Sequence, residues 1–272
     1  MVSLGDIKKL CRSGSWDFVV HSRPGNHAEE LKEYRWKGRD LFYRAGTADA
    51  GAFYEILIRP SRRVSGGYLR PGKLEYWVPS EINPEVILDI GGNIGTTSVF
   101  YSKMFPQAKI FTFEPVPGNF ELLEKNINGL DNVSAFNVGL GDSDKKVLIY
   151  DSAEQGNTGG FSIYGVDVDQ SKSQEIEVKK SASFLEEIGV TQVDLIKIDT
   201  EGAEYDILTS MDKDMLSNVK WIIGELHGIR DYELFEYLSQ WFDLDIRKTL
   251  RSNLFQFNAR NKKFADVIPW KS

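Results

Sequence analysis

The sequence predicts an α/β fold built on a mostly parallel sheet of seven strands, which ends in an antiparallel hairpin. From Val86 onward, short apolar runs alternate with amphipathic segments of helical period. This alternation is typical of a parallel sheet covered by helices on both faces. Near the end of the chain, two strand-like runs follow each other without a helical segment between them, which favours a hairpin. Residues 1–80 lack the alternation, so we expect an N-terminal cap segment (1–80) followed by a main domain (81–272).

The elements of the main domain are expected in a regular order. Strands are predicted at 86–90, 109–114, 133–138, 193–199, 219–226, 242–250 and 253–261. Helices are predicted at 94–105, 118–129, 203–211 and 231–242. Pro106 stops the first helix and Gly129 follows the second, as expected for residues that end helices.

A segment of about 40 residues (143–183) separates the third and fourth strands, and its turn-rich composition favours an extra hairpin. After it, Ser183 and Glu186 have the spacing of a capping box, and Gly189 ends the predicted helical turn.

In the N-terminal segment, residues 33–44 are predicted to form a hairpin that turns at Lys37-Gly38-Arg39. Residues 47–58 are predicted to form a helix capped by Thr47.

The composition is that of an ordinary globular protein, with 41% apolar and 27% charged residues. The only cysteine, Cys11, cannot form an intrachain disulfide, which fits a reducing compartment. Neither a signal peptide nor a membrane span is evident, so we expect a cytoplasmic protein. Residues 1–80 hold 14 Lys and Arg against nine Asp and Glu, while the whole chain carries a net charge of −7. No long basic run argues for a nucleic-acid partner.

The stretch ILDIGGNIG (87–95) contains the most informative motif. Asp89 and the glycines Gly91 and Gly95 end a buried run in the pattern D-x-G-x-x-x-G. Ligands of open parallel sheets bind beyond the carboxyl ends of the strands, where glycines allow close approach. A carboxylate there would repel a pyrophosphate and hold a cationic ligand. Glu114 follows nineteen residues after Gly95, a position suited to binding ribose hydroxyls. A ribose, a positive centre and no required phosphate together indicate S-adenosylmethionine.

Over residues 40–227 the sequence resembles the FkbM-like methyltransferases. The resemblance includes DIGGNIG, FEP, NVGLGD, KIDTEGAE and IIGELHG. It implies a Rossmann-like class I methyltransferase fold that uses S-adenosylmethionine to methylate hydroxyls of sugars, glycans or related metabolites. It further implies that the methionine and ribose portions lie along Asp89, Gly91, Asn93 and Gly95. Glu114 would then hold the ribose hydroxyls, and the adenine would be flanked by Val116 and the loop from Asn137 to Asp142.

Acceptor chemistry is expected past the ends of the fourth and fifth strands, where Asp199, Glu225 and His227 lie. Residues 1–80 are expected to form a lid or wall on the acceptor side. We predict that His227 is the general base, with an ordinary pKa near 6.5, and that Asp199 orients the acceptor hydroxyl. Glu204 can equally supply favourable charge at a helix N-terminus. Asp199 with Glu225 or His227 could also bind Mg²⁺, but carboxylates at unknown distance do not establish a metal, and the sequence assigns none.

The sequence therefore predicts an S-adenosylmethionine-dependent O-methyltransferase that acts on a small-molecule or glycan acceptor. Two alternatives stay open. An N-methyltransferase of the same fold would suit a carboxylate-rich pocket, and a binding module without catalysis could retain the fold. The glycine spacing disfavours a nicotinamide oxidoreductase, because G-x-G-x-x-G is missing. The sequence does not predict an oligomeric state.

Overall fold

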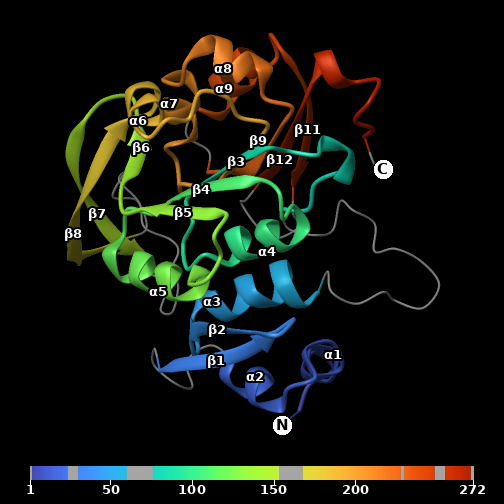
Figure 1. The fold of residues 1–272 in the computed structure, drawn as a ribbon. Helices are drawn as coiled ribbons and strands as arrows, with labels where there is room; N and C mark the ends of the chain where they lie inside the picture. The colour runs from blue at the N-terminus through green and yellow to red at the C-terminus, as the bar shows by residue number, and fades with distance from the viewer. Residues whose placement is uncertain are drawn as a thin grey trace.

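The computed structural model describes residues 2–23, 30–59, 76–152, 168–227, 230–248 and 255–270. Its main feature is a seven-stranded sheet in the order β11-β12-β10-β9-β3-β4-β5 (Figure 1). The strands are β3 (Val86–Ile90), β4 (Lys109–Phe113), β5 (Val133–Phe136), β9 (Leu195–Ile198), β10 (Trp221–Leu226), β11 (Phe242–Lys248) and β12 (Phe255–Asn261). Strands β5, β4, β3, β9 and β10 pair in parallel. The predicted α/β fold is confirmed.

The terminal hairpin is also confirmed. Strand β12 pairs antiparallel with β11 on one side and with β10 on the other. It is therefore inserted between them, and Trp221 of β10 faces Arg260 across the ladder.

Helices cover both faces of the sheet, as the apolar strands require (Figure 1). One face carries α4 (Thr96–Met104) and α5 (Pro117–Ile127). The other carries α6 (Ser181–Glu187), α7 (Glu204–Thr209), α8 (Lys213–Asn218) and α9 (Asp231–Leu238). The central strand β9 is buried at every position, so neither its apolar residues nor Lys197 faces solvent.

The insertion after β5 forms the predicted hairpin. Strands β7 (Lys145–Ser152) and β8 (Val168–Lys180) pair antiparallel, and β6 (Gly139–Gly141) adds a third strand in parallel to β8. The predicted capping box is wrong. Helix α6 begins two residues before Ser183, with Lys180 as its N-cap and no side-chain cap. The buried Ser181 at its start instead donates its hydroxyl to the Gly141 carbonyl at 3.0 Å.

The N-terminal segment is more regular than its sequence pattern indicates. It contains α1 (Leu4–Ser13), α2 (Trp16–His21), the hairpin β1 (Leu31–Trp36) and β2 (Arg39–Arg44), α3 (Ala48–Ala52) and a π-helix, η1 (Phe53–Ile58). The predicted hairpin is confirmed, and its turn lies at Lys37 and Gly38. Thr47 caps α3 as predicted, because its hydroxyl accepts from the Asp49 amide at 3.2 Å.

The N-terminal segment and the main sheet share one hydrophobic cluster. The cluster joins buried side chains of the first 80 residues with side chains of β3, α4, β4 and β10, among them Phe18, Trp36, Tyr43, Phe53, Leu57, Ile87, Val99, Ile110 and Trp221. A division into two units at residue 80 stays a prediction, but these packed side chains make the two parts energetically interdependent.

Polar contacts fix the hairpin to α5. Asn126 is buried, and its side chain accepts from the Phe42 amide at 2.7 Å and donates to the Phe42 carbonyl at 2.9 Å. Arg44 pairs with the buried Asp49 and also donates to the Asn119 side chain at 2.7 Å. These bonds place α3 beside the carboxyl edge of the sheet.

We expect a chain beginning at Ile82 to show no cooperative thermal unfolding. Removing buried Trp36, Tyr43, Phe53 and Leu57 exposes the face that they cover. Losing one large core side chain typically costs about 2–5 kcal/mol, so losing four costs roughly 8–20 kcal/mol, which is comparable to or larger than the usual stability of about 5–15 kcal/mol. Circular dichroism melting curves of the full chain and of the chain beginning at Ile82 test this. A cooperative transition in the shortened chain, with a midpoint temperature that S-adenosylhomocysteine raises, would contradict it.

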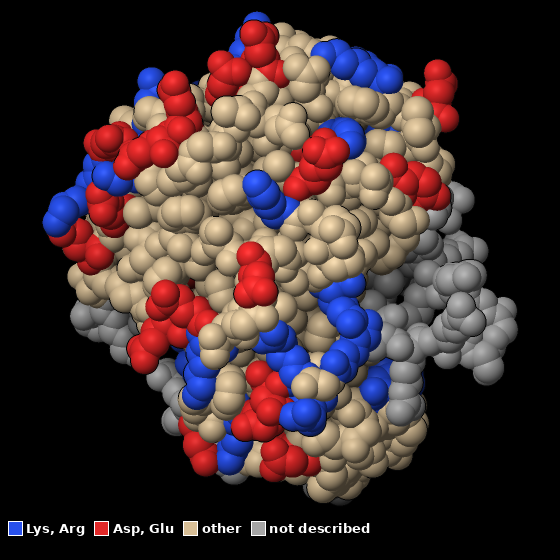
Figure 2. Space-filling view, in the orientation of Figure 1, with Lys and Arg blue, Asp and Glu red and all other residues tan. Residues whose placement is uncertain are grey.

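The molecular surface has mixed charge on the face that Figure 2 shows, where blue and red side chains are interspersed over the lower part. Among the described residues, no helix is both long and apolar enough to cross a membrane.

Candidate active site

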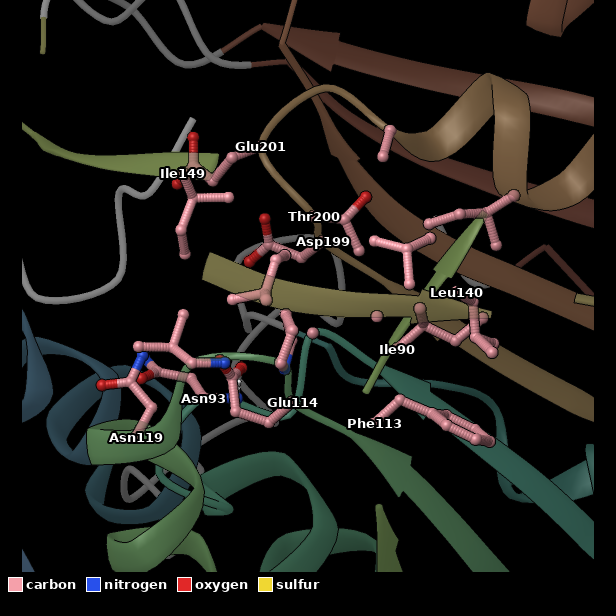
Figure 3. A pocket seen from close by; sticks show the side chains of 18 of the residues that line it. Ile90, Asn93, Phe113, Glu114, Asn119, Leu140, Ile149, Asp199, Thr200 and Glu201 are labelled. Atoms are coloured by element: carbon pink, nitrogen blue, oxygen red, sulfur yellow. Dashed lines mark hydrogen bonds between the residues drawn. The ribbon is translucent and has the colours of Figure 1, made fainter. Parts of the chain in front are cut away.

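A cavity of about 430 Å³ opens at the carboxyl ends of β3, β4 and β9. Figure 3 shows Asp199, Thr200 and Glu201 on one side of it, across from Asn93, Glu114 and Asn119. Helix α3 and the strands β6 to β8 complete the wall, through Ala48, Gly51, Ala52, Leu140, Val147, Ile149, Ile176 and Val178. Of these wall residues, the sequence indicated Leu140, through the predicted adenine loop, and it gave no individual signal for the others.

The turn after β3 brings two of the predicted cofactor residues to the cavity. Gly91 and Asn93 both line it, and both have left-handed backbones, with φ of 78° and 48°. At Gly91 an added Cβ would lie 1.8 Å from the backbone oxygen of Asp199. The neighbouring strand end therefore requires glycine at this position, whether or not a bound ligand also requires it. Gly95 lies outside the lining and starts α4, where its backbone packs on Leu123.

We expect Gly91→Ala to destabilise the protein by at least about 2 kcal/mol, since it combines a left-handed alanine with a backbone clash. Gly118→Ala is the matched control, because an added Cβ there meets nothing within 4 Å. Urea unfolding measures both. Equal midpoints for the two variants would contradict the packing described for Gly91.

Asp89 lies behind the cavity rather than in its lining. Its carboxylate is fully buried, accepts from the Ser98 hydroxyl at 2.6 Å and lies 3.3 Å from Lys197 Nζ. Lys197 also donates to the Gly91 carbonyl at 2.5 Å. Burial alone would lower the pKa of Lys197, but Asp89, Asp199 and Glu114 together raise it, so its ammonium is retained. The structure therefore gives Asp89 a contact with the glycine turn through Lys197, which the sequence analysis missed.

Glu114 is at the predicted place, directly after β4, and lines the cavity. Its two oxygens accept from the Asn93 amide at 2.8 Å and the Val116 amide at 2.9 Å. Burial raises the pKa of Glu114 to about 7, against the lowering effect of these two amides. The carboxylate joins the turns after β3 and β4 and presents its edge to the cavity.

The residues predicted to flank adenine divide into two groups. Val116 and Asp142 line the cavity. Asn137 lies outside the lining and donates to the backbone carbonyls of Glu114 at 2.9 Å and Pro115 at 3.2 Å. It therefore shapes the chain after β4. At Asp142 the hydrogen bond from Lys145 lowers the pKa of the carboxyl.

The opposite side of the cavity holds a cluster of acidic groups around His227. Asp199 Oδ1 and Glu201 Oε2 lie 3.7 and 3.3 Å from His227 Nε2. Glu204 Oε1 lies 3.1 Å from His227 Nδ1, and the Tyr76 hydroxyl donates to Asp199 Oδ2 at 2.7 Å. The sequence placed Asp199 and His227 together correctly, but it gave no signal for Tyr76.

The predicted pKa of His227 near 6.5 is wrong. Burial would lower the pKa, but the hydrogen bond to Glu204 and the charges of Glu204, Asp199 and Glu201 raise it to about 10. An imidazolium has no lone pair for a proton, so the predicted role of general base has no support in this arrangement. In Glu204, burial raises the pKa, but the bond and charge of His227 and the backbone amides lower it below its usual value.

Glu225 lies next to the cluster but outside the cavity lining. Glu225 is 9% exposed, and its Oε1 accepts from the Gln256 side-chain Nε2 at 3.2 Å. Burial and then the charge of Asp199 raise its pKa. Glu201, which does line the cavity, has a pKa raised to about 7 by burial. The structure thus brings Glu201 into the position that the sequence analysis gave to Glu225.

Known proteins resemble about half of this chain. The hexuronic acid methyltransferase AglP from Haloferax volcanii is 28% identical over 159 residues, 57% of this chain and 62% of the relative. The 2-O-methyltransferase NoeI from Sinorhizobium fredii is 27% identical over 164 residues, 56% of this chain and 65% of the relative. Methyltransferase 1 from Beauveria bassiana is 31% identical over 156 residues, 49% of this chain and 62% of the relative.

The aligned segment thus spans less than two thirds of each of these three relatives. A sequence model of the FkbM methyltransferase domain matches residues 89–257, from near the end of β3 into β12. The chain therefore belongs to the FkbM family of S-adenosylmethionine-dependent methyltransferases.

Proposed function

We propose that the protein methylates a hydroxyl group of a sugar, a glycan or a related hydroxylated metabolite. The observation that carries this proposal is the placement of Glu114 and Asp199 across one cavity, at the ends of two strands that flank β3. One carboxylate suits the ribose of the methyl donor, and the other suits the hydroxyl of an acceptor. The relatives described as a 2-O-methyltransferase and a hexuronic acid methyltransferase support an oxygen acceptor.

The residues of the cavity fit S-adenosylmethionine. Glu114 is buried at the end of β4, with both oxygens held by backbone amides, so its orientation is fixed before a ligand binds. Val116, Ile149, Ile176 and Val178 form a small apolar cluster that continues the cavity wall. An apolar wall next to a fixed carboxylate suits an adenosine, which has a flat ring and a pair of hydroxyls. Gly91 and Asn93 would lie along the remainder of the donor.

S-Adenosylmethionine, when bound, supplies an electrophilic methyl group that an acceptor oxygen can take up while the sulfur keeps the bonding electron pair. The protein holds the two reactants in line and excludes water. Asp199 is held by Tyr76 and directs its other oxygen toward the cluster around His227. We assign to Asp199 the contact with the acceptor hydroxyl, because it is the acidic side chain at the end of β9 that lines the cavity.

Product analysis tests the proposed function. The purified protein is incubated with methyl-labelled S-adenosylmethionine and a set of sugars, uronic acids, hydroxy acids and matched amino sugars. We expect label on an oxygen of at least one hydroxylated acceptor, with the atom identified by nuclear magnetic resonance. Label on nitrogen alone would favour the N-methyltransferase alternative. Donor binding without turnover of any acceptor would favour a binding module.

A further inference from the structure

Three potential metal ligands converge at the acceptor side of the cavity. Asp199, Glu201 and His227 each offer one ligand atom, and these atoms all lie within 4.8 Å of one another. The two carboxylate oxygens are 3.3 and 3.7 Å from His227 Nε2. Adjacent ligands of an octahedral ion with bonds of about 2.1 Å lie about 3 Å apart. Small side-chain movements would therefore bring the three atoms around one ion.

The imidazole is oriented as a metal ligand would be. The His227 side chain is 9% exposed, and its Nε2 is buried without a hydrogen-bond partner among the described residues. Its Nδ1 contacts Glu204 Oε1 at 3.1 Å. Metal-bound histidines usually give their second ring N–H to a carboxylate, which fixes the tautomer and aims the free nitrogen at the ion. Here the free nitrogen is aimed between Asp199 and Glu201.

The other contacts of the cluster also leave the proposed ligand atoms available. Glu204 is held by the Thr200 amide at 2.9 Å and the Gly202 amide at 3.3 Å, so it stays in place beside the imidazole. Tyr76 occupies Asp199 Oδ2 and leaves Oδ1 toward His227. Glu201 has a left-handed backbone with φ of 56°, a conformation that is costly for a non-glycine residue and that clusters at functional sites.

We infer that Asp199 Oδ1, Glu201 Oε2 and His227 Nε2 bind a divalent cation of the Mg²⁺ or Mn²⁺ class, with Glu204 and Tyr76 as positioning residues. The cation replaces the Nε2 proton that the imidazolium carries in the metal-free protein, and this proton is released to solvent. Two carboxylate oxygens favour these hard ions, and a single imidazole is compatible with Mn²⁺. Three protein ligands leave positions open toward the cavity, which Asp199 and Glu201 line. The cation also balances the acidic side chains gathered around His227.

The open positions suggest the acceptor class, a conclusion that rests on the proposed function. Two adjacent oxygens, as in a vicinal diol or a hydroxy acid, would occupy two positions of the ion. A bound hydroxyl is more acidic and loses its proton to water. Its oxygen then bonds to the methyl carbon as the carbon–sulfur bond breaks, and the electron pair stays on the sulfur of the departing S-adenosylhomocysteine.

Mn²⁺ binding to the full chain tests the site directly. Electron paramagnetic resonance titration should show one Mn²⁺ per chain, displaced by excess Mg²⁺. Glu201→Gln and His227→Gln should each weaken binding at least tenfold, and pulsed spectra should lose the nitrogen coupling in His227→Gln. Glu204→Gln should weaken binding 10- to 100-fold while keeping that coupling. Asp206→Asn is the matched control, because this carboxylate lines the same cavity but pairs with Arg230.

Melting curves and S-adenosylhomocysteine binding establish that each variant is folded. The inference is overturned if the folded wild type does not bind Mn²⁺ at millimolar concentration. It is equally overturned if Glu201→Gln and His227→Gln bind as tightly as Asp206→Asn, which would leave His227 as an ion-pair partner only. Mn²⁺ bound at these residues without any methylated product would uphold the site and count against the proposed function. Methylation that persists in EDTA, in a protein that does not bind Mn²⁺, would overturn the metal site and support the proposed function.

Discussion

Glu114→Ala is expected to weaken the binding of S-adenosylmethionine by roughly a hundredfold or more. Two hydrogen bonds from the ribose to a charged group are lost, and each contributes at least about 1.5 kcal/mol. The variant also leaves the Asn93 and Val116 amides without their buried acceptor. Glu114→Gln keeps an acceptor oxygen and should show a smaller loss. Calorimetric titration with S-adenosylhomocysteine measures both.

Glu55→Gln is the control for this prediction, because Glu55 lines the same cavity from η1 and pairs with Arg59. It should bind the product with wild-type affinity. An unchanged dissociation constant for Glu114→Ala would remove Glu114 from the donor site and, with it, the orientation of the donor proposed above.

The same carboxylate should make donor affinity depend on pH. The pKa of Glu114 is about 7 in the free protein, and ribose hydroxyls donate to its charged form, so binding releases a proton below pH 7. We expect S-adenosylhomocysteine to bind roughly tenfold more weakly at pH 6 than at pH 8. Glu114→Gln should remove this dependence. The stability of the free protein against unfolding should instead decrease over this range. A carboxyl with a raised pKa loses its stabilising contribution as pH rises from about 4.5 through 7.

Asp199→Ala is expected to lower kcat by roughly a hundredfold to ten-thousandfold, the usual contribution of a group that assists proton removal. Donor affinity should change little, because Asp199 lies across the cavity from Glu114. Tyr76→Phe removes only the hydrogen bond to Asp199 Oδ2 and should have a smaller effect on kcat. Asp206→Asn should retain wild-type turnover. A kcat for Asp199→Ala within tenfold of wild type would show that the acceptor hydroxyl is activated elsewhere.

The sequence predicted the main sheet because its central strands are buried on both faces. Such strands have continuous apolar runs, and the run from Val86 to Ile90 is one of them. The two N-terminal helices were not predicted. Helix α2 has only six residues, too few to show a clear apolar period, whereas α1 does have an amphipathic period, although none of its residues is buried.

The sequence also placed Glu114 and the glycine turn at the edge of the sheet where the cavity lies, since both follow strands at fixed spacing. The raised pKa of His227 and the cluster of carboxylates around it could not be predicted in this way. They depend on the distances to Asp199, Glu201 and Glu204, which a loop with a left-handed residue brings together. Lys197 did leave a signal, as a charged residue within a buried apolar strand, and such a residue requires a partner like Asp89.

The insertion has a consequence for how fast the product leaves. The cluster of Val116, Ile149, Ile176 and Val178 is separate from the two large hydrophobic clusters that hold the main sheet together. Segments with few buried apolar contacts open locally at lower free energy than the whole fold. We therefore expect β7 and β8 to separate from Val116 while the main sheet stays intact. Their opening rate would then limit release of S-adenosylhomocysteine, and amide hydrogen exchange in these strands would report it.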